Sequence, residues 1–258
     1  MLRTTALKWL GSVVGFMTAA SVHAALITFT DNTFTPANYS STTFVNDTSS
    51  TPVAITFGQS AGTGNPAPSW QVKFVQAPRS TLNLNSSMQG FINSTFLYNP
   101  LVNGAILGLS FSNNRFVDLG ATLNPGVSVN SRILIKQGSN YFIDVFVDPQ
   151  IRQAWYTSAT SLQTAANFNL YDFATDITNA AVHPDFSAAG GLINFGFASR
   201  LSAGGFPAGT LPDSGGIYGF DNLSISLTTQ PRSVPEPVTL ALLGLGLAGL
   251  AFGRRKQA

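Results

Sequence analysis

The sequence predicts an all-β body, an antiparallel β-sandwich of the jelly-roll type, flanked by an N-terminal signal helix and a C-terminal transmembrane helix. Three observations support this prediction: a hydrophobic period of two along the body, turn signals between short apolar runs, and an apolar segment near each end. The chain has 258 residues, no cysteine and only 9% charged residues. Without cysteine the chain has no disulfides and must rely on its hydrophobic core or on metal.

The first 24 residues have the organisation of a secretory signal peptide. Arg3 and Lys8 form a basic start, residues 9–22 are apolar, and a small-x-small cleavage site ends at Ala24. We therefore expect the mature chain to begin at Ala25. The alternative is an uncleaved anchor, which the shortness of the apolar stretch disfavours.

The body, residues 25–227, reads as one domain of short strands. Most of the runs are rich in β-branched and aromatic residues, and Gly, Pro and Asn cluster between them. The predicted strands are 26–29, 53–57, 70–75, 91–98, 105–111, 132–136, 141–147, 192–197 and 220–227. Only residues 158–168 suggest a helical turn. No repeat of about 20–50 residues is visible, which disfavours a propeller or a solenoid.

A sixteen-residue apolar run, residues 238–253, lies near the C-terminal end and is followed by Arg254, Arg255 and Lys256. As a helix this run is about 24 Å long, short of a hydrocarbon core of ~30 Å. It can span the membrane if the bilayer thins or the arginines snorkel. The basic cluster belongs on the cytoplasmic side, so the body lies outside. A core helix of a soluble domain is the alternative.

Pro235, Glu236 and Pro237 stand directly before this apolar run. The whole tail, residues 235–258, resembles the PEP-CTERM sorting signal of exported bacterial proteins. The resemblance implies cleavage near the Pro-Glu-Pro by a membrane transpeptidase, an exosortase, in a Gram-negative bacterium that makes extracellular polysaccharide. It also implies transient anchoring in the inner membrane, followed by a place on the cell surface, in the outer envelope or outside the cell. Residues 228–234 are then the linker that presents the cleavage site.

The charge of the body differs from that of the whole chain. The formal net charge of the chain is +2, but five of its basic residues lie in the leader and the tail. Residues 25–234 hold eight basic and ten acidic residues, a net charge of −2. No basic patch remains, and a nucleic-acid partner is therefore not expected.

The second half of the body carries a weaker resemblance. Trp155 with residues 164–168, then residues 184–190, 194–197 and 218–225, are similar to exported jelly-roll proteins of the concanavalin/laminin-G type. The resemblance implies a sandwich fold. It also points to two properties found in several such families, glycan binding and a structural calcium ion.

Trp155 and Tyr156 are the candidate ligand-binding residues. A site for a neutral glycan pairs an aromatic face with amides and hydroxyls, and these two residues precede a polar stretch, residues 157–164, in a predicted loop. The alternative is that Trp155 is a core residue, because large aromatic side chains are buried on average. Trp70 opens an alternating strand and is expected inside.

Asp221, Asn222 and Asp31 are the candidate metal ligands. Calcium prefers several oxygen ligands, and Asp-Asn pairs next to loop carbonyls supply them. The alternative is that these side chains cap turns through hydrogen bonds. No other cofactor is expected.

Catalysis is difficult to build from the remaining residues. His183 is the only histidine of the body, and no nucleophile motif accompanies it. Asp144 and Asp148 share one face of a predicted strand at about 13 Å, beyond the ~6.5–9.5 Å of an inverting glycosidase pair. We therefore expect a non-catalytic module of the cell surface or extracellular matrix that binds a polysaccharide. A purely structural biofilm component and an exported polysaccharide hydrolase are the second and third hypotheses.

Overall fold

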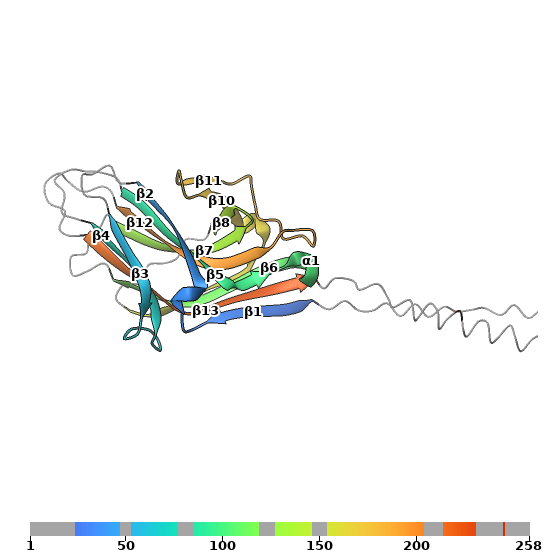
Figure 1. Cartoon of the computed structure of the whole chain (residues 1–258), viewed down its shortest axis with the longest axis horizontal. Coiled ribbons are helices and arrows are strands. Elements are labelled where there is room, and N and C mark those ends of the chain that lie inside the picture. The colour runs from blue at the N-terminus through green and yellow to red at the C-terminus, as the bar shows by residue number, and fades with distance from the viewer. Residues whose placement is uncertain are drawn as a thin grey trace, which may run out of the picture.

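Two antiparallel β-sheets packed face to face make up the body of the chain (Figure 1). The structure is a computed structural model that describes residues 24–46, 53–76, 85–118, 127–145, 154–203, 214–230 and 245. The elements of the body are β1 (Ala25–Asp31), η1 (Pro36–Asn38), β2 (Tyr39–Asn46), β3 (Ala54–Ser60), β4 (Ser69–Gln76), β5 (Asn85–Tyr98), α1 (Pro100–Asn103), β6 (Ala105–Asp118), β7 (Val127–Gln137), β8 (Asn140–Asp144), β9 (Tyr156–Gln163), η2 (Ala165–Asn167), β10 (Phe168–Asp172), β11 (Ile177–Asn179), β12 (Ile193–Ala203) and β13 (Ser214–Gln230). The predicted antiparallel β-sandwich is confirmed.

The first sheet has six strands and is centred on β13. Its order is β3-β4-β13-β6-β9, with β1 paired to β13 as well. Strand β4 pairs with residues 214–220 of β13, whereas β1 pairs with residues 223–229. The partner changes at a bulge formed by Asp221 and Asn222, where Asn222 has a φ of 50°. Asparagine adopts this left-handed conformation more readily than most residues.

The second sheet has seven strands in the order β11-β10-β8-β7-β12-β5-β2. Its long central strands β5, β7 and β12 pair over most of their length. Side chains in both sheets alternate between the interior and the outer surface, as a two-residue period requires. In β6, for example, Leu109 and Phe111 are buried and Ser110 and Ser112 are half-exposed.

Aromatic and branched side chains fill the space between the sheets. Phe195, Phe197, Leu223 and Ile225, which the sequence placed in one core, are all buried in the same cluster. Phe197 of the seven-stranded sheet and Phe220 of the six-stranded sheet have ring centroids 4.3 Å apart. This contact across the two layers joins the sheets at the centre of the molecule.

Four strands, β2, β9, β10 and β11, were not predicted. The helical turn expected over residues 158–168 is wrong, because β9 covers residues 156–163 and only Ala165–Asn167 is helical, as one 3-10 turn. Strand β9 consists mainly of Ser, Thr and Ala, which give little apolar signal. Its extended form follows from pairing with β6, a tertiary contact that the sequence pattern does not show.

The last strand is longer than predicted. It runs to Gln230, three residues into the segment assigned as the linker, residues 228–234. Thr229 is fully buried and pairs with Ala25 of β1 and Ile106 of β6. Residues 228–230 therefore belong to the sandwich.

The turn between β10 and β11 covers the middle of the outer face of the seven-stranded sheet. Phe173 in this turn is buried over Gly90 of β5, where an added Cβ would lie 2.7 Å from the phenyl ring. Asp176 fastens the turn to β12 through an ion pair with Arg200 at 2.7 Å. This part of the sheet is consequently closed to a ligand.

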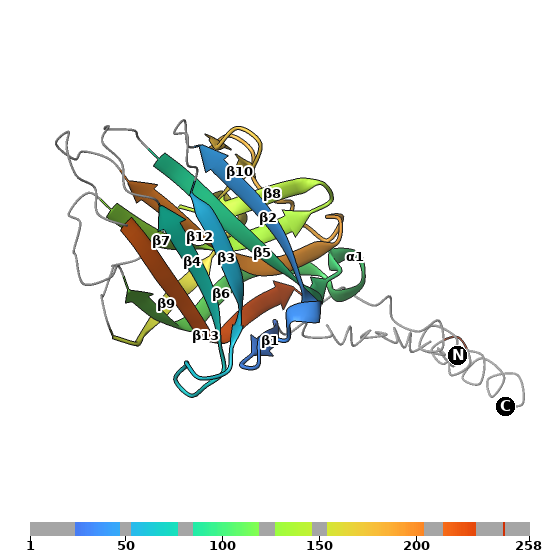
Figure 2. The ribbon, with the colours of Figure 1, turned by 60° about the vertical axis from the view of Figure 1, so that its left-hand side comes forward.

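The first and last strands of the body meet at one end of the sandwich, next to α1 (Figures 1 and 2). Ala25 pairs with Thr229, and Gln230 pairs with Ala105 just after α1. We call this the tether end, because the C-terminal tail follows Gln230 in the sequence.

The segments expected to contact the membrane lie outside the described part of the chain. They are the leader up to residue 23, with the Ala24–Ala25 cleavage site at its border, and the tail after Gln230 apart from Leu245. Among the residues that the structure describes, no helix is long and apolar enough to cross a bilayer.

Phe195→Ala should lower the free energy of unfolding by ~3–5 kcal/mol, because it leaves a cavity between the sheets. Leu97→Ala is the control: Leu97 lies on the neighbouring strand opposite Asn194 and is 46% exposed, so its loss should cost less than about 1 kcal/mol. Urea titration measures both values. Equal effects of the two substitutions would contradict the assignment of the core.

Candidate functional site

A row of outward-facing positions crosses the six-stranded sheet at the level of Gly219. Gly58 of β3 pairs with Gln71 of β4, Gln71 pairs with Gly219 of β13, and Gly219 pairs with Phe116 of β6. Trp155 follows Phe116 on the far side, since the next pair of β6 and β9 joins Arg115 to Tyr156. At ~4.8 Å per strand, Gly58 and Phe116 lie about 14 Å apart. We call these positions the glycine row.

Trp155 rests on the sheet at one end of the glycine row. A Cβ added to Gly219 would lie 3.0 Å from Cη2 of Trp155, so the missing side chain makes room for the indole. The ring also packs against Phe116, with centroids 5.5 Å apart and planes inclined by 33°. Both aromatic residues are half-buried. Together they form a partly exposed apolar surface at this end of the row.

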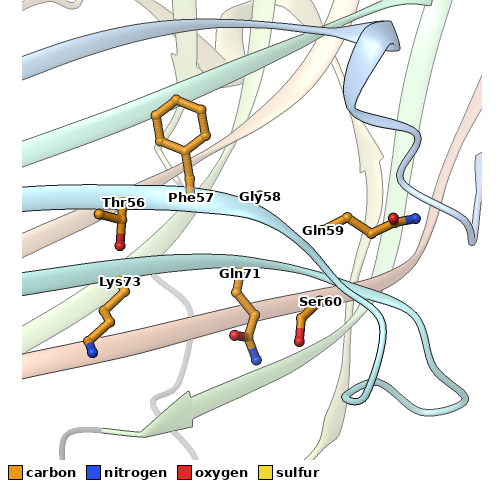
Figure 3. A pocket seen from close by; sticks show the side chains of 7 residues that line it. All are labelled: Thr56, Phe57, Gly58, Gln59, Ser60, Gln71 and Lys73. Carbon is orange, nitrogen blue, oxygen red and sulfur yellow. The ribbon is translucent and has the colours of Figure 1, made fainter.

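The other end of the row is hollow. A depression of about 300 Å³ is lined by Thr56, Phe57, Gly58, Gln59, Ser60, Gln71 and Lys73. Figure 3 shows the side chains of Thr56, Ser60, Gln71 and Lys73 on one side of the β3-β4 pair and Phe57 on the other. The first four therefore present two hydroxyls, an amide and an ammonium group to the outer surface.

Two of these groups are available to a ligand. Gln71 donates from Nε2 to the hydroxyl of Thr63 at 2.9 Å, which fixes the orientation of the amide. Its Oε1 and the Nζ of Lys73 have no partner among the residues that the structure describes. An oriented acceptor and an exposed ammonium group thus face solvent next to the hollow at Gly58.

The loop between β3 and β4, residues 61–68, lies beside the row, and we call it the wall loop. The backbone N–H of Asn65 in this loop donates to the buried carboxylate of Asp221. Its carbonyl accepts from Nδ2 of Asn222 at 2.7 Å and from Nδ2 of Asn114 at 3.1 Å. Burial raises the pKa of Asp221. These contacts hold the loop against the bulge in β13.

Asp31, one of the predicted metal ligands, caps the turn after β1. Its Oδ1 accepts from the backbone N–H groups of Thr33 at 2.9 Å and Phe34 at 2.7 Å, and its Oδ2 accepts from the hydroxyl of Tyr39 at 2.8 Å. Burial and the negative charge of Asp31 raise the pKa of Tyr39 far above its ordinary value. Both oxygens of the Asp31 carboxylate therefore accept hydrogen bonds from donors of the protein, as in a turn cap.

The predicted metal ligands do not converge on one point. Asp31 pairs with Leu223, close to Asp221 and Asn222 along β13, but it binds the turn after β1 whereas Asp221 binds Asn65 of the wall loop. Within the described ranges, no three His, Cys, Asp or Glu side chains come together as they would around a metal ion. The contacts correspond to the turn-capping alternative, and we do not propose a calcium site.

Trp155 and Tyr156, predicted to act together, point to opposite faces. Tyr156 pairs with Arg115, whose side chain is buried between the sheets, so Tyr156 faces inward and is not part of the glycine row. Trp70 is buried, as expected for a core residue. Trp155 is thus the one tryptophan of the body that lies on the outer surface.

Sequence reasoning missed four members of the site: Gly58, Gln71, Phe116 and Gly219. A glycine inside a strand often marks the close approach of another group, and this signal was present at Gly58 and Gly219. It becomes meaningful only once the strand register places the two glycines on either side of Gln71. Nothing in the local sequence of Gln71 or Phe116 separates them from other strand residues.

The residues considered for catalysis lie elsewhere. His183 contacts the backbone carbonyl of Phe168 through Nδ1 at 2.8 Å, so this nitrogen carries its proton and activates no hydroxyl. Asp144 is buried and accepts from the backbone N–H of Ile133 at 3.1 Å. Asp148 is outside the described residues.

Burial raises the pKa of Asp144 to about 7, although Arg132 and Arg115 oppose the shift. The folded protein therefore binds this proton more tightly than the unfolded chain does. The resulting stabilisation is complete below about pH 4 and is lost as the pH rises to about 7. It amounts to no more than about 4 kcal/mol.

Asp144→Asn should remove this part of the pH dependence, because an amide does not titrate while its oxygen still accepts from Ile133. Between about pH 4 and 7 the unfolding free energy of the parent should fall relative to that of the variant. Urea titrations at several pH values measure the difference. Parallel curves would show that Asp144 is already ionised in the folded state.

Comparison with known proteins gives one match to a family model, at the C-terminal tail. Residues 233–256 match the PEP-CTERM protein-sorting motif, which confirms the predicted signal containing Pro235, Glu236 and Pro237. These residues lie outside the described part of the structure. The motif identifies an exported protein that is sorted by an exosortase.

The body is similar to a solved xylan-binding domain of carbohydrate-binding module family 22. The identity is 13% and the TM-score 0.27, over 78% of this chain and 94% of that domain. A likeness at this level carries no inference about the ligand. No curated protein matches the chain.

Proposed function

We propose that the body of this exported, exosortase-sorted protein binds a polysaccharide along the glycine row. The observation that carries the proposal is the position of Trp155, which lies on Gly219 beside Phe116 and stays partly exposed. The C–H face of a sugar ring can pack on such an apolar surface. Specificity in binding sites comes from a few polar groups placed around it.

The polar groups needed for this role are present at the other end of the row. Gln71 presents an oriented amide oxygen, and Thr56 and Ser60 add hydroxyls around the hollow at Gly58. A chain lying across the strands meets the aromatic pair first and these hydrogen-bonding groups next. Nothing lies within 4 Å of a Cβ added to Gly58, so a sugar unit can approach the backbone at that end of the row.

We place the binding site on the six-stranded sheet because the outer face of the seven-stranded sheet is covered. The seven-stranded sheet is closed over its middle by Phe173, whereas on the six-stranded sheet Trp155 lies over Gly219 and nothing lies within 4 Å of a Cβ added to Gly58. Hydrolysis of a glycan requires two positioned carboxylates. In the described part of the outer face of the six-stranded sheet, Asp118 and Asp221 are the carboxylates, and Asp221 is buried beneath Asn65. This arrangement supports binding without turnover.

Trp155→Ala should weaken binding of the mature protein to the polysaccharide of its host at least tenfold, which corresponds to about 1.4 kcal/mol. Trp155 lies outside the core, so the melting temperature should change by only a few degrees. Trp155→Phe is the matched control, since it keeps an aromatic face and should retain part of the affinity. Affinity electrophoresis and thermal unfolding measure the two quantities.

Gly219→Val provides a second test that deletes no aromatic group. Its side chain would collide with the indole of Trp155 and with Cβ of Phe116, at 3.0 and 3.3 Å from the first added carbon. We expect a loss of affinity similar to that of Trp155→Ala. Unchanged affinity in both variants would exclude the glycine row as the site. A glycan array that stays silent for the parent protein would favour a structural matrix component, and turnover would favour a hydrolase.

The sorting motif gives a prediction for the ends of the chain. The mature protein should begin at Ala25 and end near Pro235–Pro237, because leader peptidase and exosortase remove the two apolar segments. Mass spectrometry of the protein from its final location measures both ends. Recovery of intact Arg254, Arg255 and Lys256 there would contradict this route.

A further inference from the structure

Exposed apolar side chains gather at the tether end of the sandwich. Thirteen large apolar side chains of the described body are exposed, and seven of them lie in segments that reach this end. These seven, which we call the apolar rim, are Leu26, Leu97, Leu101, Val102, Leu107, Leu162 and Leu192. A concentration of this kind is unusual for a protein surface that meets only water.

Strand register shows that the apolar rim surrounds one end of the molecule. Leu26 pairs with Thr228, which in turn pairs with Gly108, and the side chain of Leu162 lies over Gly108. These contacts belong to the six-stranded sheet.

The remaining members of the rim lie on β5, in α1, at the start of β6 and just before β12. Leu97 pairs with Asn194 and lies on the seven-stranded sheet, close in sequence to the α1 residues Leu101 and Val102. Helix α1 joins β5 to β6, one strand from each sheet, and so occupies the tip between them (Figure 2).

Charge is sparse at this end. Lys136 pairs with Asn194 in the row of Leu97, and the exposed Asp185 directly precedes Phe186, whose carbonyl accepts from Ile106. The segments that form this end, residues 25–30, 94–112, 159–170, 186–199 and 223–230, contain no Asp, Glu, Lys or Arg. A surface of leucine, valine, hydroxyls and amides can enter the boundary between lipid headgroups and acyl chains without desolvating an ion.

A tail inserted in the bilayer would hold this end close to the membrane. Eight residue steps separate Gln230 from Val238, the first residue of the apolar run, and they span at most about 28 Å. A helix of the tail in the bilayer therefore places α1 and the ends of β1 and β13 nearer to the lipid than any other part of the sandwich.

We propose that the apolar rim docks on the outer surface of the inner membrane while the tail is still attached, with Leu101 and Val102 at the point of contact. The proposal rests on membrane insertion of the tail and is independent of glycan binding. Docking fixes the orientation of the sandwich. The aromatic end of the glycine row, at Gly219, then stands eleven residues along β13 from the membrane, a distance of ~35 Å.

The absence of cysteine from the chain allows a direct test. Val102→Cys in the full exported chain, with its tail retained in cells that lack the exosortase, is labelled with an environment-sensitive fluorophore and reconstituted in lipid nanodiscs. Ile177→Cys is the control, because Ile177 is 62% exposed, comparable to 66% for Val102, and lies next to Asp176 on the outer face of the seven-stranded sheet. Lipids with a quencher on the acyl chain then report contact with the bilayer.

The label at position 102 should shift to shorter wavelength and lose about half of its emission to the quencher, as expected ~5–10 Å below the headgroup boundary. The label at position 177 should respond as in water, and added salt should change neither result because the apolar rim is uncharged. A chain that does not remain with the discs would overturn the anchor and the docking together. A disc-bound chain with a water-exposed label at position 102 would overturn docking alone. So would a label that is shielded only when exosortase is added, which would identify the enzyme as the partner.

Discussion

The change of partner along β13 is the constraint on which the rest of the structure depends. One strand of 17 residues serves as neighbour to β4 over its first half and to β1 over its second half. The exchange requires the bulge at Asp221 and Asn222, and the buried carboxylate of Asp221 satisfies the backbone of Asn65 there. This contact is one of three that hold the wall loop, beside the bonds from Asn222 and Asn114 to the carbonyl of Asn65. The bulge also fixes where the pairing of β4 with β13 stops, and this pairing aligns Gln71 with Gly219.

A single strand thus connects the two features to which we assign function. Gly219 lies before the bulge, under Trp155, and Gln230 lies at the end of the strand, where the tail begins. A force on the tail acts along β13, which is paired on both sides by antiparallel ladders and buries Leu223, Ile225, Leu227 and Thr229 in its second half. The binding face consequently sits on one of the most firmly held elements of the fold. Strands carry Gly58, Gln71, Phe116 and Gly219 of the row, and Trp155 lies one residue before β9.

Much of the fold follows from the sequence because burial on one face of a strand imposes a period of two. Leu223, Ile225 and Leu227 alternate with serines and were assigned to the correct face. Strand β9 was not predicted, because its Ser, Thr and Ala residues show no alternation of apolar and polar side chains. Its extended conformation depends on pairing with β6. Only part of the candidate site could be predicted from the sequence. Trp155 was recognisable as an aromatic residue before a polar stretch, but Gln71 and Phe116 become its neighbours only through the register of four strands.

The exposed apolar groups of this protein fall into two kinds with different physical environments. Trp155 and Phe116 are half-buried, rest on the sheet and keep one face for a ligand, so their exposure costs little and remains useful after export. The leucines of the rim project from the tether end and gain most from contact with lipid, which exists only while the tail is attached. Cleavage near the Pro-Glu-Pro removes that contact and leaves the rim to other apolar surfaces. The sorting step therefore changes the surroundings of the apolar rim as well as the location of the protein, and it does so about 35 Å along β13 from Gly219.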